Sequence, residues 1–110
     1  MITVTMQYAN GRPCGFSASG HAGYAESGQD IVCSAVSALT ETCVIGITEV
    51  LHVDAGVSVD NEAGITLVLD RDMAEDVSEK AELLLETMEA GLEGIRRAYP
   101  KYLKIRHREV

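Results

Sequence analysis

Cys33 and His21 are the two residues of this chain best suited to perform a reaction together. A thiolate is the nucleophilic form of cysteine, and a histidine within hydrogen-bond reach can take up and return the proton that acyl transfer moves. The two residues stand twelve positions apart in the stretch GHAGYAESGQDIVCSAVSAL, residues 20–39. Their types and spacing are compatible with nucleophilic catalysis, provided that the glycine-rich loop between them folds back.

Asp30 is predicted to be the N-cap of the helix that carries Cys33, because it directly precedes a long apolar run. Cys33 would then be the third helical residue. At that position the helix dipole and unpaired backbone N–H groups favour a thiolate, and the same N–H groups can stabilise an oxyanion. Asp30 can also orient the imidazole of His21, so its capping role and a catalytic role both remain open.

Ser37 and the loop before the helix supply the remaining candidates. Ser37 follows Cys33 by one helical turn, which places its hydroxyl on the same helix face. The loop of residues 20–29 contributes the candidate substrate-contacting residues, namely Gly20, Gly23, Tyr24 and Gly28. Because Tyr24 is the only large apolar side chain in it, we expect this loop to be mobile without substrate and to close over a bound peptide.

Three other interpretations of Cys33 stay open on the residues alone. A cysteine at the start of an apolar helix is often an inert core residue. His21, Asp30 and Cys33 are acceptable zinc ligands, although their spacing matches no common zinc site. A redox sensor would need a resolving thiol, and Cys43 lies about 15 Å further along the same helix, too far for a disulfide.

Alternating and helical periodicities predict the order ββαββαβ for the chain. Residues 2–8 alternate apolar and polar side chains, and Asn10-Gly11 predicts a hairpin into a second strand at residues 16–18. The first helix runs from Asp30 to about Val53, short strands follow at 57–59 and 65–69, a second helix covers 77–99, and a last strand contains residues 103–106. These elements predict a single α+β domain over residues 1–110, a two-layer sandwich with both helices on one sheet face.

Composition and charge limit the classes of partner. The chain has 9 basic and 17 acidic residues and a formal charge of −8, so we expect it to repel nucleic acid and to attract basic proteins. The N-terminus lacks a signal-peptide pattern, and acidic residues interrupt the apolar stretch 31–53, so we expect neither secretion nor a membrane span. Three cysteines without a CxxC pair suit a reducing, cytoplasmic location.

The first helix is apolar over more than half of its circumference. Apolar residues stand both on one stripe, from Ile31 to Leu51, and beside it, at Val32, Val36, Val44 and Ile45. One sheet face cannot cover all of these side chains. The sequence therefore predicts a homodimer that buries the remainder.

The motif around Cys33 resembles the signature of the ribosomal-processing cysteine proteases, the Prp family. The matching residues are Gly20-His21-Ala22, Gly28, Asp30, Val32-Cys33 and Ser37. The similarity extends to the length of the chain, the element order, the acidic second helix and the short basic C-terminus. Ser34 departs from the alanine that is common at its position in relatives.

This resemblance implies a catalytic dyad, a client and a mechanism. It assigns the dyad to His21 and Cys33, and it implies a cytoplasmic homodimer without cofactor or metal. The implied client is the precursor of large-subunit ribosomal protein twenty-seven, from which the protease removes an N-terminal extension. The alternative is a non-enzymatic ribosome-assembly protein that binds the same basic client without cutting it.

Overall fold

The computed structural model describes residues 1–20, 27–60, 64–70 and 72–110, with side chains omitted for residues 27–30. The strands are β1 (Ile2–Ala9), β2 (Arg12–Ser19), β3 (Ala55–Asp60), β4 (Gly64–Leu69) and β5 (Leu103–Glu109), and the helices are α1 (Ser27–Ile45) and α2 (Glu75–Ala98). A π-helical turn, Gly46–Val50, extends α1. The predicted order ββαββαβ is confirmed.

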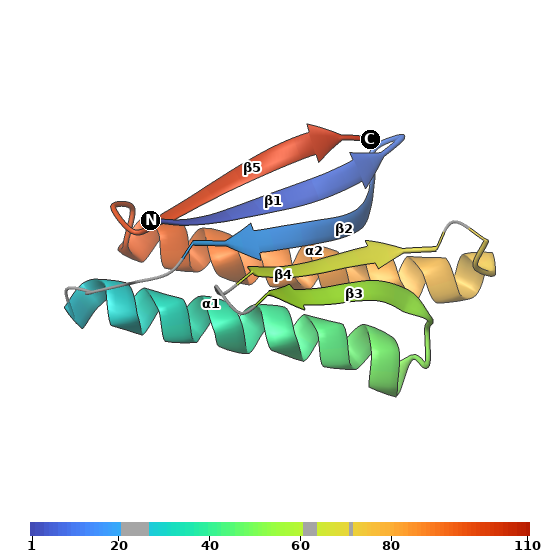
Figure 1. The fold of residues 1–110 in the computed structure, drawn as a ribbon. Helices are drawn as coiled ribbons and strands as arrows, with labels where there is room; N and C mark the ends of the chain where they lie inside the picture. Colours follow the sequence, from blue (N-terminus) through green and yellow to red (C-terminus); the bar gives the residue numbers. More distant parts are fainter. Residues whose placement is uncertain (21–26, 61–63, 71) are drawn as a thin grey trace.

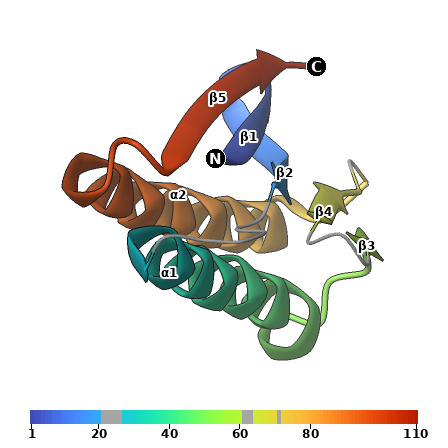
Figure 2. The same ribbon diagram turned by 60° about the vertical axis from the view of Figure 1, so that its left-hand side comes forward.

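The five strands form one sheet in the order β3-β4-β2-β1-β5, and both helices cover the same face of it (Figures 1 and 2). The first two strands form the predicted hairpin, whose two turn residues both have positive φ, 54° at Asn10 and 76° at Gly11. β5 pairs in parallel with β1, and this pairing requires the intervening helices to lie against the sheet. The predicted two-layer α+β sandwich is thus confirmed.

Alternation along the strands separates a buried face from an exposed one. Ile2, Val4 and Met6 of β1 point toward the helices and are buried, whereas the intervening residues are only partly covered. α2 contributes the buried stripe Ala81, Leu85, Met88 and Leu92. The core therefore lies between the sheet and the two helices, as the residue periodicity predicts.

The two helices approach each other closely at two glycines. A Cβ added to Gly91 of α2 would lie 3.0 Å from Cδ1 of Leu39 on α1. A Cβ added to Gly46 would lie 3.1 Å from Cδ1 of Leu84 on α2. Each helix thus receives a leucine of the other at a residue without a side chain, and the pair of contacts fixes α1 against α2.

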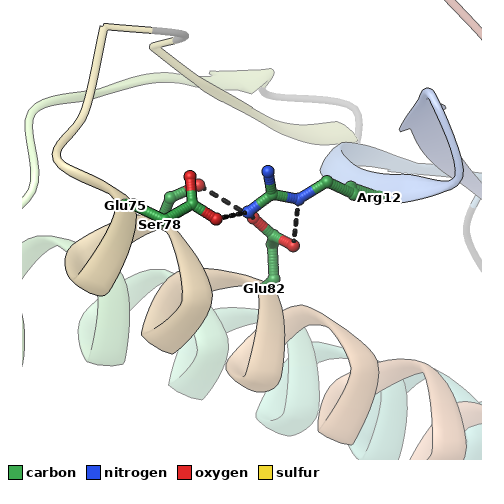
Figure 3. A network of polar contacts seen from close by, with 4 residues as sticks. All are labelled: Arg12, Glu75, Ser78 and Glu82. Atoms are coloured by element: carbon green, nitrogen blue, oxygen red, sulfur yellow. Dashed lines mark hydrogen bonds and ion pairs between the residues drawn. The ribbon is translucent and has the colours of Figure 1, made fainter.

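Arg12 connects the hairpin to the first turns of α2 (Figure 3). Its guanidinium donates to Oε1 of Glu75 at 2.6 Å and to both carboxylate oxygens of Glu82 at 2.9 and 2.7 Å. Ser78 also donates to Glu82, at 2.8 Å. The hydrogen bond from Arg12 is the main cause that lowers the pKa of Glu82. The network joins the β1–β2 turn to the helix layer.

Residues Ile31–Val50 are long and apolar enough to span a membrane by length and composition, with a mean hydropathy of 1.7. The expectation that acidic residues exclude a span on composition is therefore wrong, because two acidic side chains in twenty leave the average strongly apolar. One side of this segment packs in the protein core through Val32, Val36, Cys43 and Ile47. A core helix has the same apolar composition as a membrane-spanning one, so the composition of residues Ile31–Val50 is weak evidence for a membrane span.

Gly15 of β2 offers a direct test of the packing between β2 and β4. A Cβ at this position would lie 2.4 Å from the carbonyl oxygen of Leu67, a backbone atom that cannot move without distorting the sheet. We expect Gly15→Ala to lower the free energy of unfolding by about 1–3 kcal/mol in urea denaturation. Gly56→Ala is the matched control, since its nearest neighbour is 3.7 Å away. Equal stability of the two variants would contradict this packing.

Candidate functional site

Cys33 lies in the second turn of α1, partly buried and packed against the core cluster. Its two buried neighbours on the helix, Val32 and Val36, lie in the core, and their burial determines how the helix is rotated. Ser37 lies one turn further along and is exposed. The thiol is therefore held at the border between the core and the surface, where a substrate could reach it.

The predicted helix start at Asp30 is wrong. α1 begins at Ser27, so Asp30 lies inside the first turn and Cys33 is the seventh helical residue rather than the third. The first helical residue is about 9 Å from Cys33 along the axis. The N–H groups of the first turn are therefore not adjacent to the thiol, and any donors to an oxyanion must come from another segment.

His21, Gly23 and Tyr24 lie outside the described residues, and the side chain of Asp30 is not described either. The predicted dyad and the predicted loop closure therefore stay predictions. The strand before this segment and the helix after it are described: β2 runs toward the end of the molecule at which α1 begins (Figure 1). The chain thus passes from the strand that precedes His21 to the helix of Cys33 at one end of the sheet.

Gly20 of the predicted substrate loop lies within the described residues, and its backbone conformation favours glycine. It has φ of 90°, and an added Cβ would lie 2.4 Å from the carbonyl oxygen of Met1. Glycine is therefore needed where the chain leaves β2. Gly28 lies in the first turn of α1, inside the helix and not in a loop.

An apolar groove of about 370 Å³ lies between α1 and the β3–β4 pair. Its apolar lining residues are Val44, Ile45, Val57, Val59 and Ile65, with Ser37, Thr40, Glu41, Asp60 and Gly64 completing it. Since Ser37 is one turn from Cys33, the groove begins near the thiol. It can accept one or two apolar side chains of an extended peptide. Sequence reasoning missed this groove, although two valines on a short exposed strand are a visible signal.

The other two cysteines have different surroundings. Cys43 is buried, its Sγ lies 3.7 Å from the carbonyl oxygen of Leu84, and burial raises the pKa of its thiol to about 11. Cys14 lines a separate cavity of about 310 Å³ with α2 residues Ser78 and Glu82. Cys33 and Cys43 stand ten residues apart in one continuous helix, about 15 Å along its axis, so they cannot form a disulfide there.

His107 on β5 contacts a carboxylate of α2. Its Nε2 lies 2.5 Å from Oε2 of Glu89 on α2, and the hydroxyl of Tyr8 donates to the other carboxylate oxygen. Burial and the bond to Glu89 raise the pKa of Tyr8 above its usual range. This cluster therefore joins β1, β5 and α2, whereas Cys33 belongs to α1. α2 lies between β5 and α1 (Figure 2).

No group of three potential metal-binding side chains occurs among the residues that the structure describes. The zinc alternative invoked His21 and Asp30, whose side chains are not described, so this finding does not test it. The described residues contain the partly buried thiol of Cys33 and, one helical turn away at Ser37, the near end of an apolar groove. This arrangement suits a nucleophile that acts on a bound peptide.

Comparisons with known proteins agree with the resemblance seen in the sequence. The family model described as "Cysteine protease Prp" matches residues 1–104. The ribosomal processing cysteine protease Prp of Bacillus subtilis (strain 168) is 30% identical over 91 residues, which cover 82% of this chain and 81% of that protein.

Two crystal structures of a ribosomal processing protease Prp from S. aureus have the same fold. The complex with a substrate peptide gives a TM-score of 0.85 at 24% identity, and the complex with a covalently linked product peptide gives 0.81 at 28% identity. Each match covers 98% of this chain and 100% of the other. The similarity therefore extends over the sheet and both helices.

Proposed function

Since this chain belongs to the Prp family of cysteine proteases, we propose that it removes the N-terminal extension of large-subunit ribosomal protein twenty-seven. Cys33 is the nucleophile and His21 the general base in this proposal. The observation that carries it is the family match, which spans both residues. The partly exposed Cys33 lies one helical turn from Ser37, which lines the apolar groove. The names of the relatives support a ribosomal client.

The reaction is acyl transfer through a thioester. His21 holds the proton of the Cys33 thiol, and the thiolate attacks the scissile carbonyl carbon. The imidazolium returns a proton to the leaving amine as the peptide bond breaks. His21 then takes a proton from water, whose oxygen attacks the thioester and restores the thiol. The covalently linked product peptide in the S. aureus enzyme supports such a covalent step.

The net charge of the protein supports a basic client, and the state of its cysteines supports a cytoplasmic location. The net charge of −8 attracts a basic ribosomal protein and increases the rate of encounter. None of the three cysteines, all of which the structure describes, forms a disulfide; this suits a reducing compartment, so a cytoplasmic location is part of this proposal. A binding protein without activity would use the same charge, but the family match favours the protease.

Exposed side chains on α1 support a homodimer. Ile31, Ala38 and Ile45 recur every seven residues and are exposed, the two isoleucines by 54% and 49%. Spacing of this kind aligns residues on one side of a helix, and small residues between them allow close approach. We therefore include pairing through this side of α1 in the proposal.

Replacement of Cys33 tests the nucleophile. We expect Cys33→Ala to abolish cleavage of the precursor of ribosomal protein twenty-seven from the same organism, with products weighed by mass spectrometry. The folded state should persist, because one small, partly exposed side chain is lost. Cys14→Ala and Cys43→Ala are the matched controls and should remain active. Cleavage by Cys33→Ala at the wild-type rate would reject this mechanism, and binding without cleavage by every form would favour the alternative.

Replacement of His21 tests the base. We expect His21→Ala to reduce kcat/KM by about 10²–10⁴-fold, the usual contribution of a positioned acid–base group. His107→Ala is the matched control and should cleave normally, since His107 contacts Glu89 of α2 and not Cys33 of α1. The reverse result, an inactive His107 variant and an active His21 variant, would show that the assignment is wrong.

An exposed alanine tests the dimer. Ala38→Lys places a charge in the middle of the exposed side of α1, so we expect the mass in solution at micromolar concentration to fall from two chains to one. Ala90→Lys puts the same side chain at an exposed position of α2 and should remain a dimer. Analytical ultracentrifugation measures both. A monomeric wild type, or a dimer that tolerates Ala38→Lys, would contradict pairing through α1.

A further inference from the structure

The charges of this protein are divided unevenly along the chain. Residues 96–110 contain six of the nine basic residues and one of the seventeen acidic residues, so this segment carries +5 and the rest of the chain −13. The net charge of −8 therefore hides a strongly basic C-terminal segment. That segment includes the whole of β5, which is an edge strand of the sheet.

Three basic side chains of β5 point away from the helices. Ile105 and His107 face α2, as the contact between His107 and Glu89 shows. The alternating residues Lys104, Arg106 and Arg108 therefore lie on the opposite, open face of the sheet, and all three are exposed. We call these three residues the basic row.

The surface next to the basic row is polar and uncharged. In the parallel pairing with β1, Lys104, Arg106 and Arg108 stand opposite Thr3, Thr5 and Gln7. No helix covers this face in either view of the fold (Figures 1 and 2). Neither ion pairs nor hydrogen bonds from the basic row to other side chains occur within the described residues. The three charges are thus available to an external anion.

We propose that the basic row binds the phosphate backbone of a nucleic acid. Alternate residues of a strand are about 6.6–6.8 Å apart, a spacing similar to that of successive phosphates along one nucleic-acid strand. Threonine and glutamine beside the row can donate further hydrogen bonds to phosphate and sugar oxygens. No aromatic residue faces outward on β1 or β5, so the contact would be with the backbone and independent of base sequence.

The acidic residues do not cancel this attraction at working ionic strength. Seven of them belong to α2, on the other side of the sheet from the basic row. A helix is about 10–12 Å in diameter with its side chains, and the Debye length is about 8 Å at physiological salt. Phosphates on the open face are therefore screened from most of the acidic helix surface. The expectation from net charge alone, that nucleic acid is repelled, does not account for this separation.

Protection of a sheet edge is the simplest other use of these charges. Lys and Arg on an edge strand prevent pairing with a second sheet. The other edge strand, β3, contains neither residue type, although it exposes Val57 and Val59. An anionic membrane is a second possibility, but the outward residues of β1 and β5 offer no apolar side chain for insertion. The observations favour nucleic acid, and the experiment separates all three.

The test uses the whole protein and fluorescence anisotropy with a labelled oligouridine of about 20 nucleotides. We expect wild type to bind with Kd in the range of about 10⁻⁴–10⁻⁶ M. Three phosphate contacts should weaken binding about 20-fold between 50 and 200 mM salt, since each contributes about 0.7 to the logarithmic slope for single strands. Arg106→Gln/Arg108→Gln should reduce this salt effect to about 3-fold and weaken binding at 50 mM salt.

Two controls keep the result interpretable. Lys80→Gln/Arg97→Gln removes the same charge from α2 and should bind RNA like wild type. Arg106→Lys/Arg108→Lys preserves charge and should also bind. Absence of wild-type binding, or equal loss in the Gln pair and the α2 pair, would overturn the proposal. So would aggregation of the β5 Gln variant with unchanged RNA affinity, which indicates edge protection, or binding to phosphatidylserine vesicles but not to RNA.

Discussion

The position of Cys33 depends on how α1 is fixed between the sheet and α2. Val32 and Val36 bury one side of the helix against the core, and this burial sets its rotation. The contact of Leu39 with Gly91 sets its distance from α2. A protein interior is packed densely enough that small shifts are resisted. The helix therefore presents the thiol at the border of the core, where Cys33 packs against the core cluster.

Much of the fold follows from residue periodicity, because burial selects the same periods that define strands and helices. β1, the Asn10-Gly11 hairpin and α2 could be predicted on this basis. The start of α1 could not, since Ser27 and Asp30 are both good caps and Gly28 disfavours helix between them. The apolar run begins after Asp30, which suggested the later start. In the structure the helix begins three residues earlier, at Ser27.

The candidate site likewise contains residues that the sequence predicts and contacts that it does not. Cys33 and Ser37 could be selected from the sequence because a helix brings residues four apart onto one face. The groove and the Tyr8–Glu89–His107 cluster could not, since each joins residues from distant segments. Their formation depends on strand order, and β5 beside β1 is one of several orders compatible with ββαββαβ. Local pattern thus predicted the single elements, and tertiary contact decided what they bring together.

The separation of basic from acidic side chains follows from the alternation of side chains along β5. In a two-layer sandwich each strand has one face on the helices and one open to water. Ile105 and His107 occupy the first face of β5, so the residues between them must occupy the second. Alternation therefore gathers Lys104, Arg106 and Arg108 on one surface, while the helical period distributes acidic residues around the exposed side of α2. A net charge averages over both layers, whereas a partner meets one layer at a time, so two partners of opposite charge can each find a complementary surface.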